Sequence, residues 1–402
     1  MKLNNENKYD KLYWLINLIM IFLFGMQFMG FPHQVSFIWL GIIFVLNAIA
    51  CKNIIIDIPA VLLGIGMLVY AYIAGKGFKD VVIFAGLPVL TYLAGKGLSM
   101  RKYSFCSVED NSKATVMALT LGTFACGLLE KYSRFFRFTE ECYSGRYWFD
   151  FWDGGIRPAT YFMFYSMMIL GCVCWAVYIR KDKKIFSNIF LVIAVMELIF
   201  FGWVKTRTPF LVIAGVVAVG AVMFLWMNRR EKFIKKTLVY GGIFIGAAVI
   251  IAAGVWYGNL FNIQNSVIGK VLTHDGGIFQ NIRFVGQRNV LMQLFEYPMG
   301  GKLMDIAGLK YAHNVWLDIA YTSGAIPFFF VAAFTICTFW CCVKLVKNDK
   351  IPAEMKYLMI GVFLALHLDY SVEPVLDANL TFWAMGTFVS GIMKGYLYSR
   401  GE

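Results

Sequence analysis

The sequence predicts an all-α polytopic membrane protein with about twelve transmembrane helices. Of its 402 residues, 59% are hydrophobic and only 15% are charged, which is far more apolar than a soluble domain. Apolar runs long enough to cross about 30 Å of hydrocarbon recur along the chain, and short charged breaks separate them. Such continuous runs favour helices over a closed barrel, whose strands alternate in hydrophobicity over about 10 residues.

The predicted elements fall into three blocks. The first nine spans and an external loop at 131–156 occupy residues 1–257. A large, partly helical external loop occupies 258–312, and a short re-entrant or interfacial helix with the last three spans occupies 313–402. The N-terminus has a basic start but no small-residue cleavage site, so we expect a retained first helix. The twelve spans are predicted at 12–31, 35–50, 54–75, 79–95, 114–130, 157–179, 185–204, 208–228, 237–257, 325–343, 357–370 and 379–397.

Charged residues at the breaks predict the orientation of the spans. Net basic breaks occur near Lys52 and at 96–102, 180–184, 229–236 and 344–356. The breaks that alternate with them are neutral or mixed in sign, so the positive-inside rule places both termini in the cytoplasm and the long loops outside. We therefore interpret the basic residues that give the net charge of +13 as determinants of the orientation of the chain in the membrane. Nucleic-acid binding is not indicated, because the basic residues form no single patch or stripe.

The spacing of cysteines and histidines indicates no metal site. None of the nine cysteines forms a CxxC motif, and none of the four histidines pairs with another at i,i+3 or i,i+4 spacing. Most cysteines are expected to be free thiols inside spans. Cys126 and Cys142 both fall near the predicted outer face, so a disulfide between them is an alternative.

Two similar Gly-Lys segments occur at 72–78 and 92–98. Glycine and lysine at the end of an apolar run are typical of a helix C-cap with a cation near the negative end of the helix dipole. A phosphate cradle is the alternative, but neither segment has the GxxxxGK[ST] form of a nucleotide-binding loop. We therefore assign these segments no chemistry.

A histidine at the outer boundary of a predicted span is the strongest candidate for chemistry. His313 and Asn314 end the large loop and begin the next apolar segment, and Gly324 and Pro327 follow. This pattern predicts a short helix from about His313, a break, and then the tenth span. An imidazole has an ordinary pKa near ~6.5, so at an external surface it can be neutral and act as a general base. A structural histidine is the alternative.

Three arginines are predicted on the same side as His313. Arg283 and Arg288 lie in the large loop, and Arg207 lies in a very short turn between the seventh and eighth spans. Guanidinium forks match phosphate oxygens and stay charged, so they suit a pyrophosphate leaving group. The alternatives are contacts with lipid headgroups or ion pairs with nearby acids such as Glu296.

The loop at 131–156 is rich in aromatic residues. Arg137, Tyr147, Trp148 and the nearby Arg157 are candidates for contacts with a glycan, because aromatic faces beside polar groups suit sugars. An interfacial aromatic belt is the alternative. Glu197 falls in the middle of its predicted span, so it should be protonated, paired or facing a cavity.

The segments that carry these residues resemble the O-antigen ligase and O-antigen or capsule polymerase (Wzy-type) superfamily of bacterial membrane glycosyltransferases. The segment 205–209 looks like the family's Ser-Arg-Gly segment before a span. Gly-Gln-Arg at 286–288, followed by 297–301, looks like its Gly-Arg segment leading to Pro-Leu-x-Gly-x-Gly. His313-Asn314-x-x-Leu resembles its His-Asn-x-x-Leu run ending in Gly. The family's tryptophan after the second arginine is absent here, and Thr-Pro replaces the small residue after the first.

The resemblance implies a GT-C-like fold in the bacterial plasma (inner) membrane and an active site on the external (periplasmic) face. It implies that His313 deprotonates the acceptor hydroxyl and that Arg207, Arg288 and Arg283 hold the pyrophosphate. It also implies that Asn314, Gly300 and Gly301 support the helix that carries the catalytic histidine.

The implied reaction is the transfer of a growing glycan from undecaprenyl pyrophosphate to a sugar hydroxyl of another lipid-linked repeat unit, with inversion and without metal or cofactor. The sequence itself disfavours a metal-dependent oligosaccharyltransferase, because the first external break at 30–35 has no Asp or Glu. Two alternatives stay open: an O-antigen ligase that transfers to lipopolysaccharide core, and a lipid-linked oligosaccharide flippase. Expected partners are the lipid-linked oligosaccharide, the bilayer, and a chain-length regulator and flippase of the same pathway.

Overall fold

The computed structural model describes residues 2–27, 38–43, 45, 56–137, 147–152, 154–204, 206–229 and 282–401. The predicted span at 237–257, most of the span at 35–50 and the first part of the large loop lie outside these residues. The described helices and strands are α1 (Lys2–Gly25), α3 (Ile58–Ile73), α4 (Phe78–Met100), α5 (Val108–Tyr132), the π-helix η2 (Ser133–Arg137), β1 (Tyr147–Phe149), β2 (Ile156–Pro158), α6 (Ala159–Gly171), α7 (Val173–Ile179), α8 (Lys184–Trp203), α9 (Thr208–Met227), α12 (Ile282–Gln293), α13 (Val315–Ser323), α14 (Ala325–Lys347), α15 (Ala353–Tyr370), α16 (Val375–Ala378) and α17 (Leu380–Ser399).

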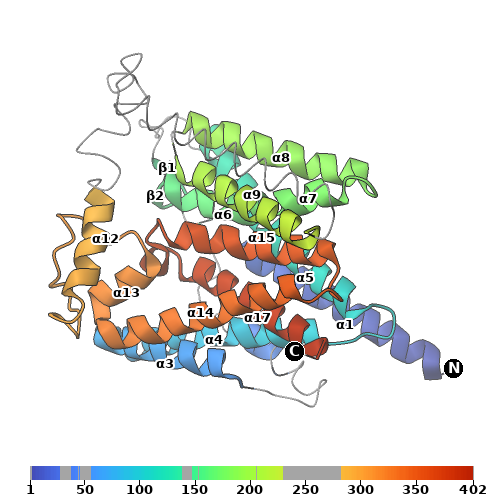
Figure 1. Ribbon diagram of the computed structural model, residues 1–402, viewed down its shortest axis with the longest axis horizontal. Helices are drawn as coiled ribbons and strands as arrows, with labels where there is room; N and C mark the ends of the chain where they lie inside the picture. The colour runs from blue at the N-terminus through green and yellow to red at the C-terminus, as the bar shows by residue number, and fades with distance from the viewer. Residues whose placement is uncertain are drawn as a thin grey trace.

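The prediction of a mostly helical membrane protein is confirmed. Figure 1 shows long helices running side by side, with α12 lying across one end of the bundle. Helix α3 is apolar but shorter than a full span. Six described segments are long and apolar enough to cross a membrane: Phe78–Met100, Val108–Phe136, Ala159–Ile179, Lys184–Trp203, Thr208–Met227 and Ala325–Lys347.

Helices α15 and α17 also lie in predicted spans, but they are more polar and almost completely buried.

Small residues let α17 approach α4 closely. A Cβ added at Gly95 would lie 2.3 Å from the carbonyl oxygen of Phe388, and one at Gly391 would lie 2.0 Å from that of Tyr92. Because lipid supplies no hydrophobic drive between helices, such close packing is a main source of helix association in membranes.

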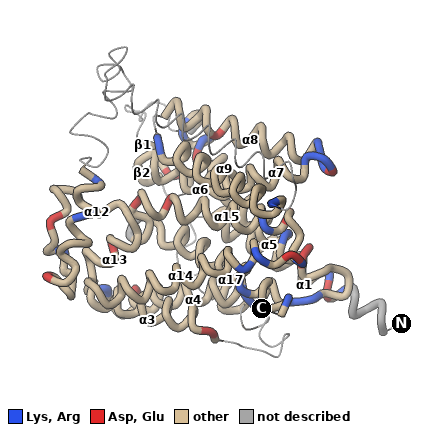
Figure 2. Tube along the Cα trace, viewed as in Figure 1, with Lys and Arg blue, Asp and Glu red and all other residues tan. Residues whose placement is uncertain are grey.

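The two ends of the bundle differ in character. At one end, ion pairs join helix termini: Lys113 pairs with Glu354 at 3.1 Å, and Arg400 pairs with Glu109 at 3.0 Å. Lys and Arg gather at this end, including the turn between α7 and α8 (Figure 2). The opposite end holds the end of α15 and the start of α9, together with α12 and α13 (Figure 1).

The interpretation of the second Gly-Lys segment as a helix C-cap is wrong. Helix α4 continues through Lys96 to Met100, and the Lys96 ammonium pairs with Asp57 at 2.6 Å. Asp57 caps the N-terminus of α3 and also accepts a hydrogen bond from the Tyr92 hydroxyl. Lys96 is buried, whereas a lysine at a helix C-cap would lie near solvent. The ion pair with Asp57 compensates the charge of this buried ammonium.

Glu197 is paired, which was one of the three expectations for it. Its carboxylate receives the ammonium of Lys131 and the hydroxyl of Ser166. The seven described cysteines, Cys126 among them, are free thiols.

A short antiparallel ribbon departs from a purely α-helical fold. β1 and β2 pair so that Tyr147 lies opposite Pro158 and Trp148 lies opposite Arg157. The ribbon leads directly into α6, and it places Tyr147 at the same end of the bundle as the start of α9.

Candidate active site

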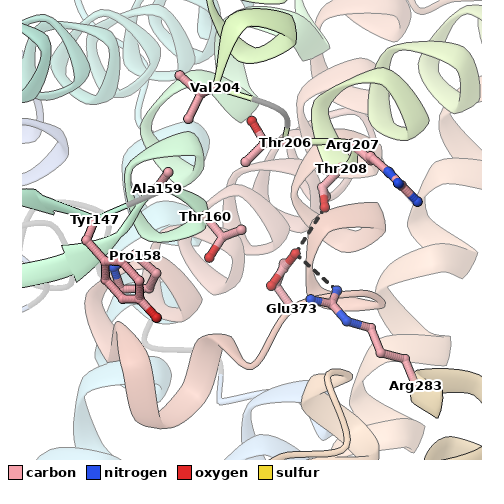
Figure 3. Close-up of a pocket in the computed structure, with 10 residues that line it drawn as sticks. All are labelled: Tyr147, Pro158, Ala159, Thr160, Val204, Thr206, Arg207, Thr208, Arg283 and Glu373. Carbon is pink, nitrogen blue, oxygen red and sulfur yellow. Dashed lines mark hydrogen bonds and ion pairs between the residues drawn. The ribbon is translucent and has the colours of Figure 1, made fainter. Parts of the chain in front are cut away.

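A cavity of about 490 Å³ opens where the start of α9, the β1–β2 ribbon and the segment after α15 meet. Figure 3 shows its side chains, with Tyr147 and Pro158 on one side and Arg207 and Arg283 on the other. The full lining is Tyr147, Pro158, Ala159, Thr160, Val204, Thr206, Arg207, Thr208, Arg283 and Glu373. Residues far apart in the sequence therefore build one pocket with both apolar and charged walls.

Glu373 is the central charged group of this cavity, and the sequence reasoning missed it. Its side chain is only 3% exposed. The Thr208 hydroxyl donates to Oε1 at 3.0 Å, and the Arg283 guanidinium lies 3.5 Å from the same oxygen (Figure 3). The other oxygen, Oε2, lies 3.9 Å from Nδ1 of His313. One buried carboxylate thus connects a helix start, an arginine and the candidate base.

His313 lies just before α13 and is not itself part of the cavity lining. Its φ of +54° is in the left-handed region, which non-glycine residues adopt only when their surroundings hold them there. Gln287 donates to the His313 carbonyl at 3.1 Å, and the preceding Ala312 N–H donates to Asp318 at 2.6 Å. Nδ1 is buried and makes no hydrogen bond with a described residue. The backbone at His313 is therefore held in place, while the imidazole has no close hydrogen-bond partner at Nδ1 among the described residues.

Asn314 fixes the position of α13 from both sides. Its side-chain oxygen accepts from the Leu317 N–H at 3.1 Å and so caps the helix, while its amide donates to the Ser371 carbonyl at 3.1 Å. This second bond ties the start of α13 to the segment that carries Glu373. Asn314 therefore sets the spacing between the candidate base and the carboxylate.

The two arginines of α12 do not share a role. Arg283 points toward the cavity, where it donates to the Val372 carbonyl at 3.3 Å and pairs with Glu373. Arg288 is exposed, does not line the cavity and forms no ion pair with a described residue. The two positions are about 140° apart around an α-helix, so the two side chains leave the helix in different directions. The resemblance-based role of Arg288 in holding pyrophosphate is not supported by this placement.

Arg207 immediately precedes α9 and lines the cavity with an exposed side chain. It forms no ion pair with a described residue, and in Figure 3 its guanidinium extends away from Glu373. The N-terminus of α9 lies beside it, and helix N-termini favour anions. Arg207, Arg283 and this helix end make one wall of the cavity suited to phosphate oxygens.

Gly300, Gly301 and Gly324 join the segment after α12 to the break between α13 and α14. Gly301 and Lys302 donate backbone hydrogen bonds to the Thr322 and Tyr321 carbonyls at 3.0 and 2.9 Å. Gly324, with φ +83° and ψ −163°, occupies a region that is essentially restricted to glycine. This arrangement produces the short helix and break that the sequence predicted.

We expect Gly324→Ala to lower the free energy of unfolding by about 1–3 kcal/mol or more, because alanine is strained at the φ and ψ of Gly324. The added Cβ would also lie 1.9 Å from the Pro298 carbonyl oxygen. The fraction of purified protein that stays monodisperse after heating would measure the loss. Gly308→Ala is the matched control, since Gly308 also has positive φ but no atom within 4 Å of an added Cβ. Equal losses in the two variants would contradict the role of the Pro298 contact.

The ribbon residues separate into two groups. Tyr147 is exposed and lines the cavity, so it remains a candidate glycan contact. Trp148 is only 1% exposed and stacks on Phe162, so it packs in the core and offers no free face to a sugar. Arg157 lies opposite Trp148 in the ribbon and is not part of the cavity lining, and the backbone of Arg137 ends η2.

The cavity combines two guanidiniums with one carboxylate, which gives it a net positive charge before His313 is counted. Among the described residues, no three His, Cys, Asp or Glu side chains come together as metal ligands. Comparison of the chain with protein-family models and with curated proteins finds no match.

Proposed function

We propose that the protein is a membrane glycosyltransferase of the polysaccharide polymerase type, which uses an undecaprenyl-pyrophosphate-linked glycan as donor. The observation that supports this proposal most strongly is the grouping of Arg207, Arg283, Glu373 and His313 at one end of the bundle. A cationic wall suits a pyrophosphate, and an imidazole held beside a buried carboxylate suits a general base.

In the proposed reaction, the glycosidic carbon of the donor loses its bond to the pyrophosphate oxygen and gains a bond to the acceptor oxygen. The acceptor hydroxyl proton passes to His313, and the electron pair of the broken bond leaves with the pyrophosphate. Arg207 and Arg283 stabilise the charge that develops there. Glu373 pairs with Arg283 through one oxygen, and its other oxygen lies 3.9 Å from Nδ1 of His313, so Nε2 is left to meet the acceptor.

The orientation predicted from charge accords with this proposal. The ion pairs and basic turns at the opposite end of the bundle suit a cytoplasmic face, so the cavity would open at the external face of the plasma membrane. Twelve spans, with both termini in the cytoplasm, would complete this topology. The donor lipid would then reach the cavity from the outer leaflet.

A transporter of lipid-linked oligosaccharide would be expected to use charges inside the bundle. Asp57 and Glu197 are two acids in apolar parts of the sequence that could serve such a role, and each has a fixed partner: Lys96 for Asp57 and Lys131 for Glu197. These pairings favour structural roles for both acids. A ligase would use the same donor site as a polymerase and would differ only in its acceptor.

The test is to supply the full-length protein in nanodiscs with lipid-linked repeat units, with and without a lipopolysaccharide core acceptor. A ladder of products without core is the expected result. A single addition that requires core would replace the polymerase by the ligase. Absence of any transfer, with movement of the lipid across the bilayer in a vesicle assay, would overturn the enzyme proposal in favour of the flippase. Addition of a chelator is expected to leave the ladder unchanged.

A further inference from the structure

Helix α12 carries an exposed apolar stripe on the face turned away from the other described residues. Phe284, Leu291 and Met292 are 45%, 51% and 72% exposed, and Arg288 lies among them. At 100° per residue, these four positions fall within about 100° of one another around the helix. Phe295, which is 75% exposed, continues the stripe just beyond the helix end.

The opposite face of α12 is committed to the protein. Gly286 and Val290 are buried, and a Cβ added at Gly286 would lie 2.9 Å from the Ile306 carbonyl oxygen. Arg283 and Gln287 reach the Glu373 segment and the His313 carbonyl. The helix is thus held firmly on one side, and its apolar residues are left on the other.

The stripe is continuous with the exposed apolar surface of a candidate membrane span. The Phe295 ring lies 6.2 Å from the ring of Phe329 on α14, one of the helices apolar enough to cross a membrane. Phe329 and Ile326, in the first turn of α14, are themselves 49% and 51% exposed. Figure 1 shows α12 lying across the ends of the long helices, which is the direction of a helix that lies in the plane of a bilayer surface.

We propose that α12 is an interfacial helix whose stripe of Phe284, Leu291, Met292 and Phe295 inserts into the outer-leaflet phospholipid. Arg288, in the middle of the stripe, then extends its long side chain so that its guanidinium meets the lipid phosphates. This contact seats α12 at a fixed depth and so holds Arg283 at the cavity. The proposal concerns the bilayer surface alone, so it stands or falls independently of glycan transfer.

The test uses the full-length protein in nanodiscs that contain a phospholipid with a photoactivatable diazirine in its acyl chain. After irradiation, trypsin separates residues 289–302 from residues 311–344, and the second peptide contains α14 as a positive control. We expect lipid adducts on 289–302, at Leu291, Met292 or Phe295, with a yield within about tenfold of that on α14. Adducts on α14 without any on 289–302 would overturn the proposal.

Two variants sharpen the assignment. Met292→Asp should lower adduct formation on 289–302 at least about fivefold, because a charge opposes insertion, and should leave the α14 adducts unchanged. Glu296→Gln, an exposed position in the same peptide but outside the stripe, is the matched control and should leave both yields unchanged. If the stripe is instead covered by a second copy or by another part of this chain, protein crosslinks will replace lipid adducts on 289–302, and the proposal is wrong.

Discussion

The His313→Ala variant should transfer glycan about 10²- to 10⁴-fold more slowly than the unaltered protein, because loss of a general base typically costs that much. The side chain is held just before α13 by contacts of its neighbours, so its removal deletes the imidazole without deleting those contacts. The measurement is the initial rate of ladder formation from lipid-linked repeat units in nanodiscs. Unused donor should accumulate.

Donor binding separates this effect from simple unfolding. In the proposal the pyrophosphate is held by Arg207 and Arg283, so the donor affinity of the His313→Ala variant should change by no more than a few-fold. Lys310→Ala is the control, since Lys310 is exposed and lies three residues away, outside the proposed site. If the histidine variant forms ladders at the unaltered rate, His313 is not the base.

The fold followed from sequence where the signal was local. Long apolar runs predicted helices because lipid leaves a backbone few other ways to satisfy its hydrogen bonds. The segment that holds Asn314 and Gly324 predicted a short helix and a break. The structure adds that Asn314 caps α13 and that Gly324 adopts a glycine-restricted conformation. The interpretation of Lys96 was wrong because its partner is distant in the sequence. Its partner Asp57 is 39 residues away, and a pairing at that separation leaves no pattern in the sequence.

The candidate site was only partly predictable. Motif spacing favoured Arg288, but helix geometry turns Arg283 toward the cavity instead. Glu373 has no motif around it. The signal that could have found it is its place in the last predicted outer break, where an acid directly precedes Pro374 between two spans. Trp148 was indistinguishable from an interfacial aromatic residue, because the ribbon that buries it forms from two segments that pair only in the fold.

Glu373→Gln should lower the transfer rate by about 10²-fold or more. In hydrolases that use a similar arrangement, loss of the carboxylate that orients a catalytic histidine costs up to about 10⁴. Glutamine keeps the shape and can still accept from Thr208, but it removes the charge that faces both Arg283 and His313. The rate should therefore fall even though the fold is retained. Initial rates of ladder formation provide the measurement, with monodisperse elution as the check on folding.

Graded variants test whether Glu373 acts through its two neighbours. Thr208→Val removes only one hydrogen bond to the carboxylate and should cost a few-fold, whereas Glu296→Gln removes an exposed charge elsewhere and should cost nothing. Double variants are more discriminating. Once His313 is alanine, Glu373→Gln should keep only the part of its effect that acts through Arg283, because residues that act as a unit are strongly non-additive. Full additivity would show that Glu373 does not position the base, since the carboxylate would then matter equally with and without the imidazole beside it.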